Sequence, residues 1–459
     1  MVENKKILNL VCDDWDDQNL PKINGSKHYG DRFFWDGSNF IYFYLNTVAS
    51  SEEKFEIKFN KFEDVYNNPN ERFFYILNHS RSDLWCLYNI EQLLPELNMG
   101  GNSYSLPDPD NIPRSPISSE LERVLKDCPN FNIIFLTEHE PDTERGFIAV
   151  NDDVVSRGIN GKQIYILNNN SKLVEYRHNH NSSINVRTLS FIPFSSTDVL
   201  VHTGGCEWKE HKEGKFFMCF NKSPKPHRYT LLVLLMKNEL LDKFNWSLVP
   251  SWDCFISFEN YRPFLSAENV WNMRWEIWYF QNLKIKKSDF EEDKGWFREH
   301  QEPDTSELPN WMRIPELTDT YKESYVNVVT ESEFSSRFNV IHISEKSFRP
   351  FYFYQFPMIL ATQFHIAKMK EIYGFDFYDD IIDHSYDNEP DDEKRMMMFY
   401  KEIERLSNYT DPLMKYYAKN RERFEENKRK VEAILTDETD FHFFKSLTNN
   451  VNVEIKNII

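Results

Sequence analysis

Short apolar runs separated by polar segments are the feature that most constrains how this chain can fold. The clearest runs of the first half lie at 73–77, 132–136 and 163–167. Runs of this kind are typical of strands buried on both faces of a parallel sheet, so we predict an α/β fold. Polar clusters follow the last two runs, at 137–142 and 168–171. Ligands of open α/β sheets bind beyond the carboxyl ends of the strands, which is where these clusters are expected.

The length of the chain predicts two domains. A chain of 459 residues with an aromatic content of 16% can build two sizeable cores. We predict an N-terminal domain over 1–210, a C-terminal domain over 211–415 and a charged helical tail over 416–459. The acidic segment 288–318 is interpreted as a surface insertion or flap of the second domain.

The segment 325–332, followed by 343–349, predicts an anion site. The first part is typical of a buried strand that ends in Glu331 and Ser332. The second part predicts the start of a helix with Ser344 as its N-cap. A helix N-terminus offers free N–H groups and partial positive charge, which suit a phosphate.

The side chains around this predicted helix start extend the site. Lys346 and Arg349 add positive charge for a diphosphate. Glu331 and Glu345 remain to hold hydroxyl groups, with Ser332 and Ser344 assisting. The combination predicts a nucleotide-sugar site. Ordinary helix capping is the alternative interpretation, because serine and glutamate are common in the first turn of any helix.

A second basic helix start favours the anion site. A predicted strand at 215–220 is followed by a basic loop and by a helix that begins near Arg228. Two basic helix starts in one half of the chain are harder to explain as solvated surface than one. The chain has 13 glycines and no glycine-rich phosphate loop, so cations and helix ends would have to hold the phosphate.

The remaining chemistry of the sequence predicts no metal and no bound cofactor besides a nucleotide-sugar co-substrate. The pairs Asp14/Asp16 and Asp108/Asp110 are interpreted as polar turns. Six scattered cysteines without metal-ligand spacing predict reduced core thiols.

Charge and hydropathy set the expected partners and location. A net charge of −19 makes nucleic acid an unlikely partner. No apolar run approaches the ~18 residues that span a bilayer. The N-terminus does not resemble a signal peptide. We therefore expect a soluble, cytoplasmic protein, and its residue usage suits the AT-rich genome of a bacterium or of a virus in an infected host cell.

The motifs of the second half resemble the α1,3-fucosyltransferase signature. The family signature runs Phe-Glu-Asn-Ser, a spacer, Tyr-Ile-Thr-Glu-Lys and then Arg. This chain is similar to it at 330–332, where it reads Thr-Glu-Ser, and after a spacer at 343–346, where it reads Ile-Ser-Glu-Lys. An aromatic residue and Arg349 follow. The segment 356–360 is similar to the strand of the Val-Pro-Val-Val kind that follows in the family. The resemblance covers about 214–390.

The resemblance implies a GT-B-like fold, in which two Rossmann-like domains face each other across a cleft. It implies a metal-independent, inverting glycosyltransferase with a GDP-fucose-like donor and a glycan or lipid-linked saccharide as acceptor. Arg228, Lys346 and Arg349 would bind the donor diphosphate. Glu331, Ser332, Ser344 and Glu345 would bind its ribose or sugar.

The catalytic base is expected in the first domain. The segment 137–141 resembles the family's Thr-Gly-Glu-Asn-x-x-Pro segment, so Glu138 or Glu140 would remove the acceptor proton. His139 stays open as an alternative base. Two other functions also stay open: a viral glycosyltransferase that modifies a hydroxymethylated DNA base, and a non-catalytic sugar-binding protein with the same fold.

Overall fold

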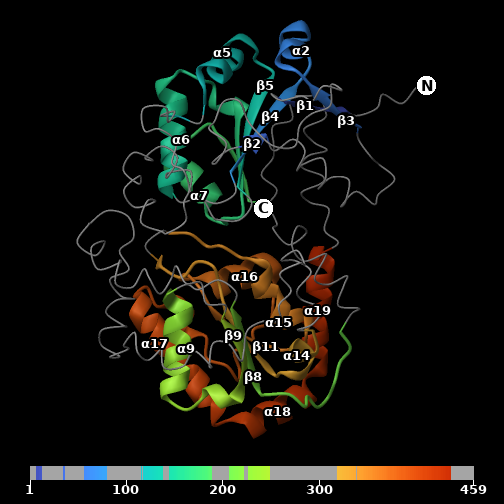
Figure 1. The fold of residues 1–459 in the computed structure, drawn as a ribbon, viewed down its shortest axis with the longest axis vertical. Helices are drawn as coiled ribbons and strands as arrows, with labels where there is room; N and C mark the ends of the chain where they lie inside the picture. Colours follow the sequence, from blue (N-terminus) through green and yellow to red (C-terminus); the bar gives the residue numbers. More distant parts are fainter. Residues whose placement is uncertain are drawn as a thin grey trace. The chain divides into compact units, whose positions relative to one another are not determined.

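The chain divides into two compact units, each with its own parallel sheet (Figure 1). One unit comprises Met1–Asn98, Ser103–Phe191 and Asp437–Ile459, and the other comprises Met99–Asn102 and Ile192–Thr436. The computed structural model describes residues 7–12, 35–36, 56–79, 115, 117–137, 144–188, 206–221, 226–248, 318–336 and 339–435.

The described strands of the first unit form a sheet in the order β3-β1-β4-β5-β6-β7, all parallel, with the short β2 antiparallel to β4. The chain adds β3 on one side of β1 and all later parallel strands on the other side. The strands are β1 (Ile7–Val11), β2 (Trp35–Asp36), β3 (Glu56–Asn60), β4 (Phe73–His79), β5 (Phe131–Thr137), β6 (Ile164–Asn168) and β7 (Asn185–Thr188).

The apolar runs predicted as strands are the central strands of this sheet. The predicted runs at 73–77, 132–136 and 163–167 fall in β4, β5 and β6, whose apolar residues are buried. Gln163, just before β6, donates from Nε2 to the carbonyls of Leu125, Cys128 and Phe131, which ties β6 to the preceding helix and strand. The helical elements are α2 (Phe62–Asn67), α5 (Ser119–Asp127), α6 (Glu144–Ser156), η2 (Gly161–Gln163) and α7 (Leu173–Asn179).

The second unit has a parallel sheet in the order β11-β10-β8-β9. The chain places β9 on one side of β8 and then crosses to the other side for β10 and β11, so the winding reverses between β8 and β10. These strands are β8 (Phe217–Asn221), β9 (Phe244–Leu248), β10 (Val326–Thr330) and β11 (Phe356–Leu360). β8, β10 and β11 fall on apolar runs of the sequence, whereas β9 alternates apolar and polar residues.

Helices lie on both sides of this sheet, α9 and α17 on one side and α15 and α19 on the other (Figure 1). The predicted helix after the basic loop is α9, and Pro226 is its first residue, as expected from the fixed φ of proline. The helical elements are α9 (Pro226–Lys237), η3 (Leu241–Lys243), α14 (Thr318–Glu323), η7 (Glu345–Phe348), α15 (Arg349–Tyr352), α16 (His365–Tyr373), η8 (Ser385–Asn388), α17 (Asp392–Ser407), α18 (Thr410–Lys419) and α19 (Arg421–Leu435).

The described part of the charged tail, 416–435, is helical and packs on the second unit. Helix α19 contacts α15, and the Phe424 ring stacks on Tyr378 with 4.3 Å between ring centroids. Arg423 pairs with Asp376 and Asp380 at 2.5 and 2.9 Å. The α/β class with parallel sheets is confirmed, and the four described cysteines, Cys12, Cys128, Cys206 and Cys219, are buried free thiols as expected.

We expect Gln355→Leu to lower the free energy of unfolding of the second unit by about 3 kcal/mol, because two buried carbonyls would lose their donor. Gln355 is buried before β11 and donates to the carbonyls of Tyr321 and Ser324, while its Oε1 accepts from Asn327. Urea unfolding measures the change. Gln363→Leu, which removes one exposed bond to the carbonyl of Asn388, is the control and should change stability by less than about 0.5 kcal/mol. Equal losses in the two variants would contradict this role of Gln355.

Candidate functional site

The predicted anion-binding residues meet where the winding of the second sheet reverses. Ladder pairing between β8 and β10 joins Phe217 to Val326 and Met218 to Asn327, at the beginning of both strands. At their carboxyl ends the contact is made by side chains, since the Thr330 hydroxyl donates to the carboxamide oxygen of Asn221. Open α/β sheets bind ligands beyond the carboxyl ends of their strands at such a reversal.

Glu331, directly after β10, is the centre of this region. Its residue is 0% exposed, and its backbone N–H donates to the carbonyl of Leu360 in β11 at 3.0 Å. Oε2 accepts from the Ser332 N–H at 3.1 Å and from the Ser344 hydroxyl at 2.7 Å. Oε1 accepts from the Ser344 N–H at 3.2 Å and from the Ser347 hydroxyl at 2.5 Å.

These bonds give Glu331 a positioning role. Both oxygens already accept hydrogen bonds from the protein, so the carboxylate fixes the loop that carries Lys346 to the end of β10. Burial by itself would raise the pKa of Glu331. The charge of Lys346, two nearby histidines and the Ser347 bond outweigh burial and hold that pKa well below its usual range. Direct contact of Glu331 with a donor hydroxyl stays a prediction.

The predicted helix start at Ser344 exists, but the helix is short. The Ser344 hydroxyl accepts from the Lys346 N–H at 3.3 Å, which confirms the N-cap. A single 3-10 turn, η7, then runs into the four-residue α15. Because so few peptide dipoles are aligned, the helix itself adds little positive charge. Any phosphate here would depend on the cationic side chains.

Arg228 and His227, at the second predicted basic helix start, contact the end of β10. Arg228 is buried, and its Nη2 donates to the carbonyls of Thr330 and Glu331 at 3.2 and 3.3 Å. The Nε2 of His227 lies 2.9 Å from the Glu331 carbonyl, and its ring stacks on Phe334. Arg228 and Glu331 are 103 residues apart in the sequence, so the fold joins the two predicted basic segments at one strand end.

Lys346, Arg349 and Glu345 form the accessible part of the cluster. The Lys346 side chain is 29% exposed, and its Nζ lies 3.3 Å from Glu345 Oε1 and 3.2 Å from the Ser344 hydroxyl. Arg349 Nη2 lies 3.5 Å from the same Glu345 oxygen, and Nη1 donates to the Tyr321 hydroxyl. Within the described part of the chain, the buried Nε of Arg349 has no hydrogen-bond partner. Glu345 thus lies between the two cations that would hold a diphosphate.

The other predicted residues contribute less or cannot be placed. Ser332 is half-buried and takes part through its backbone N–H. Glu138, Glu140 and the alternative His139 lie outside the described residues, as do both Asp pairs and most of the acidic segment. The candidate base therefore stays a prediction.

Sequence reasoning missed three residues of the cluster. Ser347 connects Glu331 to His365, whose Nε2 lies 2.9 Å from the Ser347 hydroxyl. His342 is buried beside Glu331, and burial lowers its pKa to about 4. His365 begins α16, and no motif connects it with the Ser344 segment. A serine one residue beyond Lys346 was the only visible signal.

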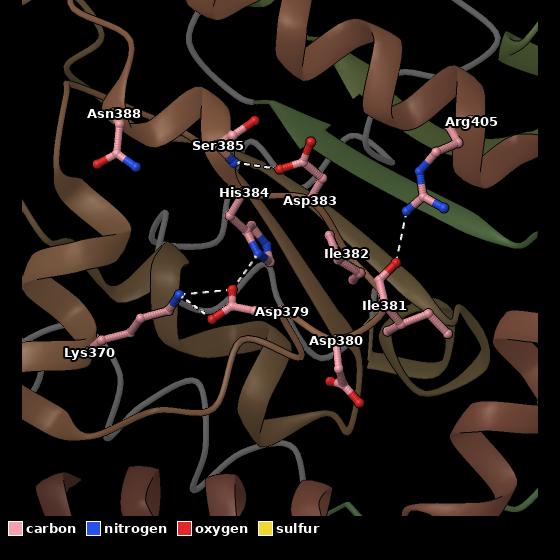
Figure 2. A pocket seen from close by; sticks show the side chains of 10 residues that line it. All are labelled: Lys370, Asp379, Asp380, Ile381, Ile382, Asp383, His384, Ser385, Asn388 and Arg405. Carbon is pink, nitrogen blue, oxygen red and sulfur yellow. Dashed lines mark hydrogen bonds and ion pairs between the residues drawn. The ribbon is translucent and has the colours of Figure 1, made fainter.

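A separate cavity of about 500 Å³ lies toward the amino end of β11 (Figure 2). Asp379 binds Lys370 at 2.6 Å and His384 at 3.1 Å, and the other ring nitrogen of His384 lies 3.1 Å from the Pro357 carbonyl. Arg405 donates to the Ile381 carbonyl. These charged groups bind one another or the backbone, so we assign them the role of stabilising the loop 379–384. The lining residues are Lys370, Asp379, Asp380, Ile381, Ile382, Asp383, His384, Ser385, Asn388 and Arg405.

Comparisons of the chain with protein-family models, with curated proteins and with solved structures gave no match. Among the described residues, no helix is long and apolar enough to cross a membrane. The same residues contain no group of three or more metal-ligating side chains. Inferences about function therefore depend on the geometry at the end of β10.

We expect the stability of the protein to fall as the pH falls from 6.5 to 4, in part because of His342. The unfolded histidine takes up its proton near pH 6.5, whereas the folded one does so only near pH 4. The contribution of the neutral His342 to the free energy of unfolding is therefore complete above pH 6.5. It falls by about 3 kcal/mol between pH 6.5 and 4.

The variant His342→Gln should flatten the pH dependence by that amount, measured by urea unfolding at several pH values. The matched control is His178→Gln, at an exposed position of the first unit, and it should retain the wild-type slope. Identical slopes for wild type and His342→Gln would contradict the neutral, buried state of His342.

Proposed function

We propose that the protein is a metal-independent, inverting glycosyltransferase of the GT-B type that uses a nucleoside-diphosphate sugar, with a GDP-fucose-like donor favoured. The observation that carries the proposal is that Arg228 and the Ser344–Arg349 segment both bind Glu331, at the winding reversal of a parallel sheet. Such reversals are the usual ligand sites of this fold class. The α/β architecture alone would not support a function, since one fold serves many chemistries.

Glu345 occupies the place that a diphosphate would take beside Lys346 and Arg349. Its carboxylate lies near Lys346 and Arg349, and the charges of Glu331 and Glu333 also act on Arg228. The three cations of the cluster are therefore balanced by three carboxylates. A diphosphate carries more negative charge than one carboxylate, so we expect it to displace Glu345 from Lys346. The released carboxylate would then be free to accept hydrogen bonds from donor hydroxyls.

The proposed reaction is a single displacement. The acceptor hydroxyl oxygen forms a bond with the anomeric carbon of the donor while the bond from that carbon to the diphosphate oxygen breaks. The base, predicted to be Glu138 or Glu140, takes the hydroxyl proton. The electron pair leaves on the diphosphate, where Lys346 and Arg349 would stabilise the developing charge. Attack opposite the leaving group inverts the anomeric configuration.

A thermal-shift screen against GDP, UDP, CDP, ADP and their sugar conjugates tests the proposal. We expect at least one nucleotide to stabilise the protein without a divalent ion, by about 2.7 kcal/mol at 100 times its dissociation constant. The substitution Lys346→Ala should abolish the shift because it removes the most exposed cation of the cluster.

Lys370→Ala is the matched control for this screen. Lys370 also pairs with a carboxylate and is 35% exposed, but it lines the separate cavity. It should leave nucleotide binding unchanged. Loss of binding in Lys370→Ala and not in Lys346→Ala would move the site to the cavity, and no shift with any nucleotide would refute the proposed function.

We expect Glu345→Gln to strengthen the binding of inorganic pyrophosphate roughly two- to fivefold, because the amide no longer competes for Lys346 and Arg349. Isothermal titration calorimetry measures the affinity. Glu371→Gln, which removes a surface pair with Lys368, is the control and should leave the affinity unchanged. Weaker binding by Glu345→Gln would mean that the carboxylate supports the anion site instead of occupying it.

A further inference from the structure

The loop between β11 and α16 lies at the same edge of the sheet as the cation cluster. Thr330 and Leu360, the last residues of β10 and β11, are paired in parallel register, and the Glu331 N–H donates to the Leu360 carbonyl. His365, at the other end of the loop, contacts the hydroxyl of Ser347. Ser347 directly follows Lys346 in the sequence. The loop 361–364 is therefore joined to the proposed diphosphate site at both ends.

Phe364 has a costly backbone conformation in this loop. Its φ is +66° and its ψ is 14°, in the left-handed region that favours glycine. Bonds from its N–H to the Asp387 carbonyl and from the Lys368 N–H to its own carbonyl hold it there. Its residue is 43% exposed, and it is the only exposed phenylalanine in the part of the chain that the structure describes. Strained backbone of this kind is common at ligand sites.

Two buried polar atoms flank Phe364 without partners among the described residues. These are the Thr362 hydroxyl and the Nδ1 of His365. A carboxylate can only accept, so the hydrogen of Ser347 goes to Glu331, and His365 must donate from Nε2 to Ser347. The Nδ1 atom is then left with a lone pair that no donor meets. Unpaired buried atoms of this kind often mark a place that a ligand completes.

The chemistry of the loop does not favour a second phosphate. Two N–H groups in the first turn of α16, at Ile366 and Ala367, both donate to the Asp387 carboxylate at 2.9 Å. The negative charge of that carboxylate would repel an anion at this helix start. A flat ring and a neutral hydroxyl group match the loop better, since one can stack on Phe364 and the other can donate to His365.

We propose that the loop 361–364 binds the nucleoside of the donor, with its base stacked on the Phe364 ring. The inference depends on the proposed function, because it assigns the nucleoside half of a ligand whose diphosphate half lies at Lys346 and Arg349. A ribose hydroxyl would donate to His365 Nδ1. The Nδ1 atom of His365 is buried in the structure, so this contact requires the loop 361–364 to open. A change of the Phe364 backbone from its left-handed conformation to a relaxed one would open the loop.

Calorimetric titrations of the full chain with GDP, UDP, CDP, ADP and inorganic pyrophosphate test the inference. Phe364→Ala should weaken the nucleoside diphosphate that wild type binds best roughly tenfold, the usual effect of losing one base–aromatic stack. Its affinity for pyrophosphate should not change. Phe364→Tyr, which keeps the ring, should bind like wild type.

Two controls separate binding from folding. Phe364→Gly removes the ring and relieves the backbone strain, so it should be at least as heat-stable as wild type and still lose nucleotide affinity. Ile372→Ala removes an exposed apolar side chain from the other end of α16 and should change neither property.

The outcomes distinguish the two proposals. If nucleotides bind in a Lys346-dependent manner and Phe364→Ala and wild type bind them equally, the inference is wrong and the proposed function stands. If wild type binds nucleoside diphosphates no more tightly than pyrophosphate, the nucleoside site is refuted. If wild type binds none of these ligands, both proposals fail.

Discussion

The buried carboxylate of Glu331 is the interaction on which the candidate site depends. Three hydrogen bonds from Ser344 and Ser347 to its oxygens join the N-terminal end of η7 to the end of β10. The backbone carbonyl of the same residue accepts from Arg228 and lies 2.9 Å from the Nε2 of His227. A buried charge is costly unless several groups compensate it. Lys346, the hydroxyls of Ser344 and Ser347, and two histidines supply those groups. The stability of this strand end and the placement of Lys346 therefore have one physical cause.

The same network also sets the electrostatics of any ligand site here. The cations are balanced by carboxylates in the structure, and Lys346, Arg349 and Glu345 are partly accessible. A diphosphate would carry enough negative charge to displace Glu345 from Lys346 and Arg349, whereas a single carboxylate would not. The proposed site would therefore select a diphosphate over a single carboxylate. The adjoining loop with Phe364 adds an uncharged, strained surface, which suits the neutral half of a nucleotide.

Much of this arrangement could be predicted from single segments. The apolar runs predicted the central strands, Pro226 marked the start of α9, and Ser344 acts as an N-cap. The predictions failed where a contact joins distant segments. The helix after Ser344 is only a 3-10 turn followed by one α-helical turn, and Ser347 and His365 entered the site unforeseen. Local patterns hold no information on which segment covers a strand end.

The sequence by itself determined the strands, the helix caps and the supply of cations, because each depends on side chains a few residues apart. Only the tertiary structure decided that β10 lies between β8 and β11, and that decision brings Arg228, Glu331 and His365 together. It also placed the Glu331 carboxylate in a buried position where both oxygens accept hydrogen bonds from the protein, while its contact with a donor hydroxyl stays a prediction. Burial is a property of the assembled unit, and it decides whether a carboxylate meets a ligand or its own chain.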